Sequence, residues 1–135
     1  MRGKLALLLL FLASACAAAP SLKPIICNFY LQGESQWHVR TRAGQYGIQQ
    51  PIYFYNGTNA SDLTGYTVVF RYGRNRGDTN PVNVASINYG TYAVATFTNG
   101  QLPQAVSSWY ADVVCTSGSV YNVSCEGLIT IIGTP

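Results

Sequence analysis

The feature that most constrains this chain is a series of short apolar runs in which every second residue is hydrophobic. Segments such as Pro51–Tyr55 and Tyr66–Tyr72 alternate in this way and end close to Gly or Asn residues. Period-two alternation is typical of half-buried strands, and outside the N-terminal segment no run of about ten or more residues has the period of a helix. Ten Tyr and five Phe suit such pleated surfaces. We therefore expect an all-β protein, an antiparallel sandwich or barrel of about seven or eight strands.

Residues 1–19 have the pattern of a secretory signal peptide. Arg2 and Lys4 precede the apolar run 5–12, and small residues follow it. The run is too short to span a bilayer, which takes about 20 apolar residues. Ala-Ser-Ala-Cys, ending at Cys16, resembles a bacterial lipobox in which the cysteine is acylated, and ordinary signal-peptidase cleavage nearby is the alternative. We expect a secreted or extracytoplasmic protein, at the cell surface, in the periplasm or in a virion.

Removing this segment changes the charge balance of the chain. The sequence has eight basic and five acidic side chains, and losing Arg2 and Lys4 leaves six against five, a net charge of +1. A nucleic-acid partner is not expected, because binding to phosphates requires a clear excess of Lys and Arg. We expect residues 20–23 to be a short tether and residues 24–135 to be a single domain, with membrane contact only through the signal peptide or a lipid anchor.

The segment at 51–72, PIYFYNGTNASDLTGYTVVFRY, joins an apolar strand to an alternating strand through DLTGY at 62–66. It resembles the corresponding segment of small immunoglobulin-like domains in phage tail and upper baseplate proteins. Leu102, SSWYADVVC at 107–115 and SCEGLITII at 124–132 follow in the order of the later elements of those domains. The resemblance implies an immunoglobulin-like antiparallel β-sandwich of about seven or eight strands.

The same resemblance, which spans residues 44–132, implies a non-enzymatic module of a phage-type virion (tail, baseplate or fibre) that acts in assembly or attachment. Its partners would be protein subunits of the assembly or a cell-surface receptor. The signal peptide favours an alternative, a bacterial cell-surface lipoprotein or adhesin-like domain that binds protein or glycan. Within the motif, we expect Asp62 to accept hydrogen bonds from backbone amides just ahead and Gly65 to adopt a positive φ.

Three cysteines remain after the signal peptide: Cys27, Cys115 and Cys125. Their spacing contains no CxxC pair and no His partner, so a zinc site is not expected. A turn at 117–118 places Cys115 opposite residue 120 or 121, roughly 13–17 Å from Cys125, and a disulfide needs Cα atoms within about 7 Å. We expect Cys27 to pair with Cys125, because the first strand of such sandwiches often runs beside the last, and the third cysteine to be a buried thiol.

The first candidate binding site is a patch of outward-facing residues on two strands. Alternation in segments 51–55 and 66–72 places the residues between the expected core positions on the outer surface. One turn-rich loop joins the two segments, so we expect them to be adjacent and antiparallel. Tyr and Arg are favoured in protein interfaces. The expected patch, which would contact a partner subunit or receptor, consists of Tyr53, Tyr55, Val69 and Arg71.

The second candidate is the polar loop 73–81, which carries Arg74, Arg76 and Asp78. The tripeptide Arg76-Gly77-Asp78 can engage integrins when exposed, although so short a motif often arises by chance. If the patch on the strands has no partner, this loop is the next region to test.

Catalysis is not expected from this sequence. The single histidine, His38, alternates with apolar neighbours and should face solvent. No GxSxG elbow, phosphate-binding loop or Ca²⁺ loop is present in the sequence. Glu34 could be paired with Asp112 or Glu126 as glycosidase carboxylates, but nothing in the sequence singles out such a pair. We expect no catalytic residues, no cofactor and no metal.

Overall fold

A computed structural model describes residues 20–102, 106–118 and 121–133. The expected signal peptide and the acylation site at Cys16 lie outside the described residues. The described part of the chain contains strands and one 3₁₀ turn, and none of its helical residues form a segment able to cross a membrane. The elements are β1 (Ile25–Asn28), η1 (Phe29–Leu31), β2 (Ser35–Arg42), β3 (Ile48–Asn56), β4 (Asn59–Ala60), β5 (Thr67–Gly73), β6 (Val82–Asn88), β7 (Tyr92–Phe97), β8 (Ser107–Ser117) and β9 (Tyr121–Ile132).

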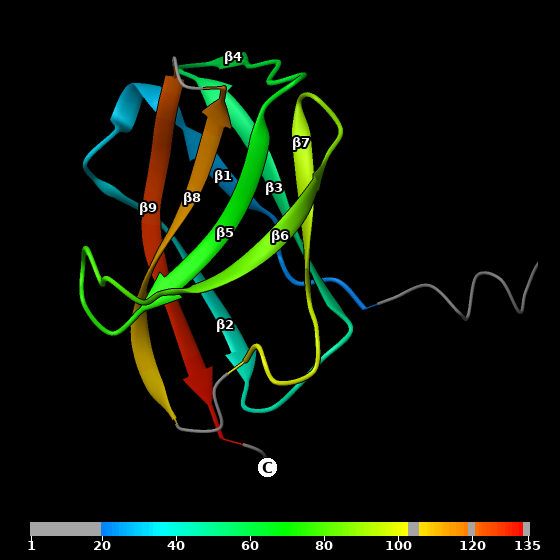
Figure 1. The fold of residues 1–135 in the computed structure, drawn as a ribbon, viewed down its shortest axis with the longest axis vertical. Coiled ribbons are helices and arrows are strands. Elements are labelled where there is room, and N and C mark those ends of the chain that lie inside the picture. Colours follow the sequence, from blue (N-terminus) through cyan, green and yellow to red (C-terminus); the bar gives the residue numbers. More distant parts are fainter. Residues whose placement is uncertain (1–19, 103–105, 119–120, 134–135) are drawn as a thin grey trace, which may run out of the picture.

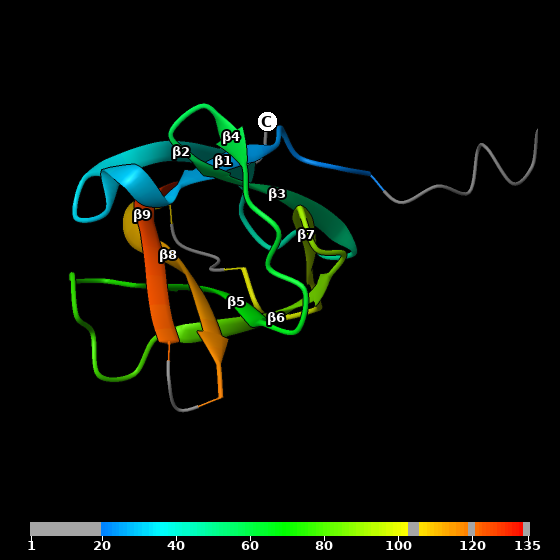
Figure 2. The ribbon, with the colours of Figure 1, turned by 90° about the horizontal axis from the view of Figure 1, so that it is seen from above.

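The strands form one mixed sheet in the order β1-β3-β7-β6-β5-β8-β9-β2, and the two-residue β4 pairs with β3. The sheet curls on itself, so that β8 and β9 lie on one side of the molecule and β3 and β7 on the other (Figures 1 and 2). The expectation of an all-β fold is confirmed.

Two strand pairs differ from the expected antiparallel arrangement. β1 runs parallel to β3, and β2 runs parallel to β9. The reason is the path of the chain: β2 follows β1 in the sequence but pairs at the far end of the sheet with the last strand, before the chain returns to β3 beside β1. A hairpin would have made these neighbours antiparallel, whereas a crossover connection makes them parallel.

Residues 20–22, expected to belong to a tether, continue the line of β1 along β3. The amide of Leu22 donates to the carbonyl of Gln49 at 2.8 Å, and the amide of Gln49 donates to the carbonyl of Pro20 at 3.0 Å. Residues 20–22 are therefore hydrogen-bonded to the sheet and do not form a free tether.

The core lies inside the curled sheet and follows the period-two pattern of the strands. Phe54, Phe70 and Phe97 are fully buried, and the ring of Trp37 lies 5.7 Å from that of Phe70. Trp37 occupies the space above Gly127, where an added Cβ would lie only 2.2 Å from the indole ring. A glycine is therefore required at this point of β9, because any side chain would displace the tryptophan.

The DLTGY turn has the predicted geometry. Asp62 Oδ1 accepts hydrogen bonds from the Thr64 amide at 3.0 Å and the Thr64 hydroxyl at 2.6 Å. These bonds lower the pKa of Asp62, and Gly65 has φ +85°. The role of Asp62 is thus to shape the turn that precedes β5.

Cys27, Cys115 and Cys125 are buried thiols in this structure. The predicted register of the last hairpin is wrong: Cys115 lies opposite Val123, because the connection after Ser117 is wider than a two-residue turn. Cys125 is then a diagonal neighbour of Cys115, at a Cα separation of about 7–8 Å, so these two still do not favour a bridge. A side-chain hydrogen bond with Cys125, together with burial, holds the pKa of Cys27 well above its usual value. The two expected bridge partners therefore lie near each other, and their bond stays a prediction.

Candidate functional site

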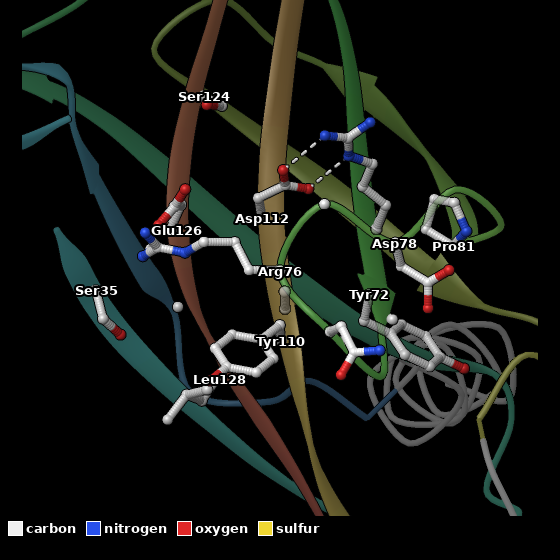
Figure 3. Close-up of a pocket in the computed structure, with 16 residues that line it drawn as sticks. Ser35, Tyr72, Arg76, Asp78, Pro81, Tyr110, Asp112, Ser124, Glu126 and Leu128 are labelled. Atoms are coloured by element: carbon white, nitrogen blue, oxygen red, sulfur yellow. Dashed lines mark hydrogen bonds and ion pairs between the residues drawn. The ribbon is translucent and has the colours of Figure 1, made fainter. Parts of the chain in front are cut away.

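A pocket of about 410 Å³ opens on the outer surface of β5, β8 and β9. The polar loop 73–81 leaves the end of β5 and folds over β8 and β9, and so forms one wall (Figures 1 and 3). The strands form the floor, since Tyr110, Asp112 and Glu126 point outward from them into the pocket (Figure 3), and Arg71 lines the pocket beside Asp112. Further lining residues are Ser35, Tyr72, Gly73, Asn75, Arg76, Gly77, Asp78, Pro81, Ala111, Ser124, Gly127 and Leu128.

The strongest polar contact in the floor joins Arg71 to Asp112. The two residues face each other across β5 and β8. Arg71 donates from Nε to Oδ1 at 2.7 Å and from NH2 to Oδ2 at 2.8 Å, a bidentate arrangement (Figure 3). This contact raises the pKa of Arg71, and it orients both side chains in a fixed plane.

A second ion pair reaches down from the loop. Arg76 donates from NH2 to the Oε2 atom of Glu126 (Figure 3). Glu126 lies directly opposite Asp112 across β8 and β9, so two carboxylates stand side by side. Like charges in this position destabilise a sheet, and the two guanidinium groups offset that repulsion. The two ion pairs balance each other in charge, and Asp78 adds a third carboxylate to the pocket lining.

The loop holds its shape through Asp78. Its carboxylate accepts hydrogen bonds from the amide of Asn80 at 2.9 Å and from the amide of Arg74 at 3.1 Å. Gly73 permits this approach, because a Cβ there would lie 2.7 Å from the Cβ of Asp78. Within the Arg-Gly-Asp tripeptide both charged side chains thus already have partners in the protein: Arg76 contacts Glu126 and Asp78 caps its own loop.

Aromatic side chains support the loop and line the pocket. The ring of Tyr72 meets Trp109 edge-on at 5.9 Å, and the guanidinium of Arg74 lies 5.2 Å above the Trp109 ring. Burial raises the pKa of Tyr72 to about 12. Tyr110 is 49% exposed and offers its ring to a ligand in the pocket. The site thus combines an open aromatic ring with two ordered ion pairs.

The predicted strand patch is wrong. Tyr53 and Tyr55 lie on β3, which pairs with β1, β4 and β7, whereas Val69 and Arg71 lie on β5, which pairs with β6 and β8. The loop between β3 and β5 does not make a hairpin, so β7 and β6 separate the two strands in the sheet. The four residues therefore belong to two distant surfaces.

The structure instead brings Arg71 together with the predicted loop residues Arg76 and Asp78. Arg74, the other predicted loop residue, contacts Trp109 beside the pocket. Tyr110 was not singled out from the sequence, and Asp112 and Glu126 were considered only as carboxylates that could pair with Glu34. The alternation in SSWYADVVC places Tyr110 and Asp112 on the outer surface, but only the β5–β8 pairing shows that they face Arg71.

The chemistry of this arrangement favours recognition. The carboxylates of Asp112 and Glu126 are already engaged by guanidinium groups, so the pocket offers fixed donors and acceptors to a ligand. His38 is exposed on β2 with its Nε2 atom 2.6 Å from the Thr130 hydroxyl, outside the pocket lining. Among the residues that the structure describes, no three His, Cys, Asp or Glu side chains gather as metal ligands.

No protein-family model matches the chain, and a search of curated proteins found no similar sequence.

Proposed function

We propose that the protein is an exported, non-enzymatic attachment module with an immunoglobulin-like fold, and that the pocket over β5, β8 and β9 holds its ligand. The strand order supports the fold assignment. An immunoglobulin-like sandwich would hold the neighbours β3–β7 in one sheet and β5–β8–β9 in the other, with β2 parallel to the last strand, and these pairings are present. Here β6 pairs with both β5 and β7 and joins the two groups into one sheet.

The observation that carries this function is the two ion pairs held side by side in the pocket. Arg71 and Arg76 present N–H donors, and Asp112 and Glu126 present acceptor oxygens, at fixed positions on paired strands. A strongly charged ligand would have to break these ion pairs, whereas a neutral ligand with several hydroxyl groups can bond to both kinds of group. The half-exposed Tyr110 adds a ring on which a sugar can stack.

The ligand class is therefore a neutral glycan, presented by a cell surface. The context is a phage-type virion that attaches to its host, and the second candidate is a bacterial surface lipoprotein or adhesin. The N-terminal pattern supports export in both cases, because residues 1–19 have the pattern of a cleavable signal. Intact-mass analysis of native protein tests this part: loss of about the first 15 to 19 residues is expected, and a native chain that begins at Met1 contradicts export.

The binding test uses a panel of immobilised glycans, followed by calorimetric titration with the best soluble oligosaccharide. Tyr110→Ala should weaken binding at least about tenfold, the size of one lost stacking contact. The matched control is Tyr89→Ala, which removes a similarly exposed tyrosine, 55% against 49%, that does not line the pocket. Soluble sugar is used so that valency does not enter the comparison.

Two results would contradict the proposal. If wild-type protein attaches to cells but binds no glycan on the panel, the ligand class is wrong. If Tyr110→Ala binds the sugar as tightly as wild type while remaining folded by circular dichroism, the pocket is not the binding site.

A further inference from the structure

The outer surface of β1, β3, β7 and the end of β6 carries no charged side chain, and we call it the neutral face. It lies across the molecule from β8 and β9 (Figure 2). Its exposed members include large apolar side chains: Ile26 is 47% exposed, Ile87 63% and Tyr89 55%. Single exposed apolar residues are ordinary, but a contiguous group on one sheet face marks an interaction surface.

The strand register shows that these residues are contiguous. Ile26 is paired with Tyr53 across β1 and β3, and Tyr53 is paired with Tyr92 across β3 and β7. One step along the same face, Val94 stands between Pro51 and Ile87. Two adjacent rows of apolar side chains therefore each cross three strands without interruption by a charge.

The tyrosines of the first row are stacked on one another. The rings of Tyr53 and Tyr92 lie 5.6 Å apart, and those of Tyr92 and Tyr89 lie 4.9 Å apart with an angle of 17°. The Tyr92 ring stacks on both Tyr53 and Tyr89, so its faces are covered. Its edge and hydroxyl group are left for contact with another molecule. Such a surface suits contact with another protein better than stacking of a sugar, which needs a free ring face.

The polar groups of the neutral face identify the partner. The hydroxyls of the three tyrosines and of Thr96, and the amide of Gln49, can each donate and accept hydrogen bonds. A surface made only of such groups is complementary to itself. The pocket side differs, because its guanidinium groups and the carboxylates of Asp112 and Glu126 are already joined in ion pairs within one copy.

We propose that the neutral face is the interface of a homodimer, in which two copies pack this face together about a two-fold axis. In an isologous contact residue i of one copy meets residue j of the other and j meets i, and on this face no charges meet wherever the axis lies. A partner bearing charged residues would have to bury them without counter-charges on this face. The ligand pockets of both copies then point away from the interface. The proposal does not depend on what the pocket binds.

The test is sedimentation velocity of residues 20–135 from micromolar to several hundred micromolar protein. Wild type should show a concentration-dependent monomer–dimer equilibrium. Ile87→Lys buries a charge without a counter-charge on the neutral face of each copy and should raise the dissociation constant at least about thirtyfold. The matched control is Val106→Lys, since Val106 is equally exposed, at 66% against 63%, but stands outside the neutral face. It should dimerise like wild type.

Tyr89→Lys is a second variant on the same face, to be used together with thermal unfolding so that loss of the dimer is separated from loss of the fold. Wild type that stays monomeric throughout the range overturns the proposal. So does a dimer that persists unchanged in folded Ile87→Lys and Tyr89→Lys, because the contact would then lie on another surface.

Discussion

The two outer faces of this sheet have the same construction and opposite chemistry. On β5, β8, β9, β2 and the loop 73–81 stand eight of the eleven charged side chains of residues 20–135, including both ion pairs. The neutral face, on β1, β3, β7 and the end of β6, has none. In both, alternation sends every second residue inward to the same core. Alternation of apolar and polar residues thus sets only which side chains face outward. The chemistry of those outward side chains differs between the two faces.

The largest expected effect on stability comes from a disulfide between the two sides of the sheet. Cys27 stands on β1, at the edge of the neutral face, and Cys125 stands on β9 beneath the charged face, near enough to raise the pKa of Cys27. We expect glutathione disulfide to join them, and a bridge that closes so long a loop should add about 4 kcal/mol to the free energy of unfolding. Non-reducing peptide mapping and urea unfolding with and without reductant measure this. A link between residues 115 and 125 would contradict it.

The next largest effect on stability is expected from the packing of Trp37 against Gly127. Gly127→Ala on β9 would drive a Cβ into the Trp37 ring, and we expect a loss of about 3 kcal/mol of unfolding free energy. The control is Gly133→Ala, whose Cβ meets only Val106 at 3.6 Å and should cost little. Urea unfolding compares the two. Equal stabilities would mean that the tryptophan is not held against β9 as described.

A smaller effect is expected from the ion pair in the pocket floor. Asp112→Ala leaves the Arg71 guanidinium without its bidentate partner, and we expect a loss of about 1 kcal/mol, since both side chains are partly exposed. Gln49→Ala on the neutral face removes no charge and should cost less. A double-mutant cycle with Arg71→Ala isolates the pair, and a coupling energy near zero would show that the contact orders the pocket without stabilising the fold.

The smallest expected effect is that of salt on the dimer dissociation constant. Raising NaCl from about 0.05 M to about 1 M should change the dimer dissociation constant by less than about threefold, because the neutral face has no charges to screen. A steep loss of dimer with salt, followed by sedimentation, would move the interface to the charged side.

Alternation alone was enough to predict the strands and the core positions. Ile52, Phe54, Val68 and Phe70 are buried as the pattern requires, and the loop 73–81 begins and ends where its polar residues indicate. Asp62 likewise makes its predicted turn, because the partners of that turn lie within two residues.

Strand neighbours could not be predicted in the same way. The pattern of 51–55 and 66–72 contains no information on the two strands, β7 and β6, that come between them, so the predicted patch was divided. The contact of Arg76 with Glu126 spans fifty residues and depends on the β8–β9 pairing. Tyr53 therefore faces outward as predicted, but its cross-strand neighbours are Ile26 and Tyr92 and not residues of β5.

The division of labour between the faces is tested most directly by backbone amide NMR of one labelled sample. Dilution of the protein should shift signals of Tyr53, Ile87 and Tyr92 on the neutral face, and addition of the best-binding oligosaccharide should shift Tyr110 and Asp112. The account predicts two sets of residues that do not overlap. Sugar-induced shifts centred on the neutral face, or dilution shifts centred on the pocket, would contradict it.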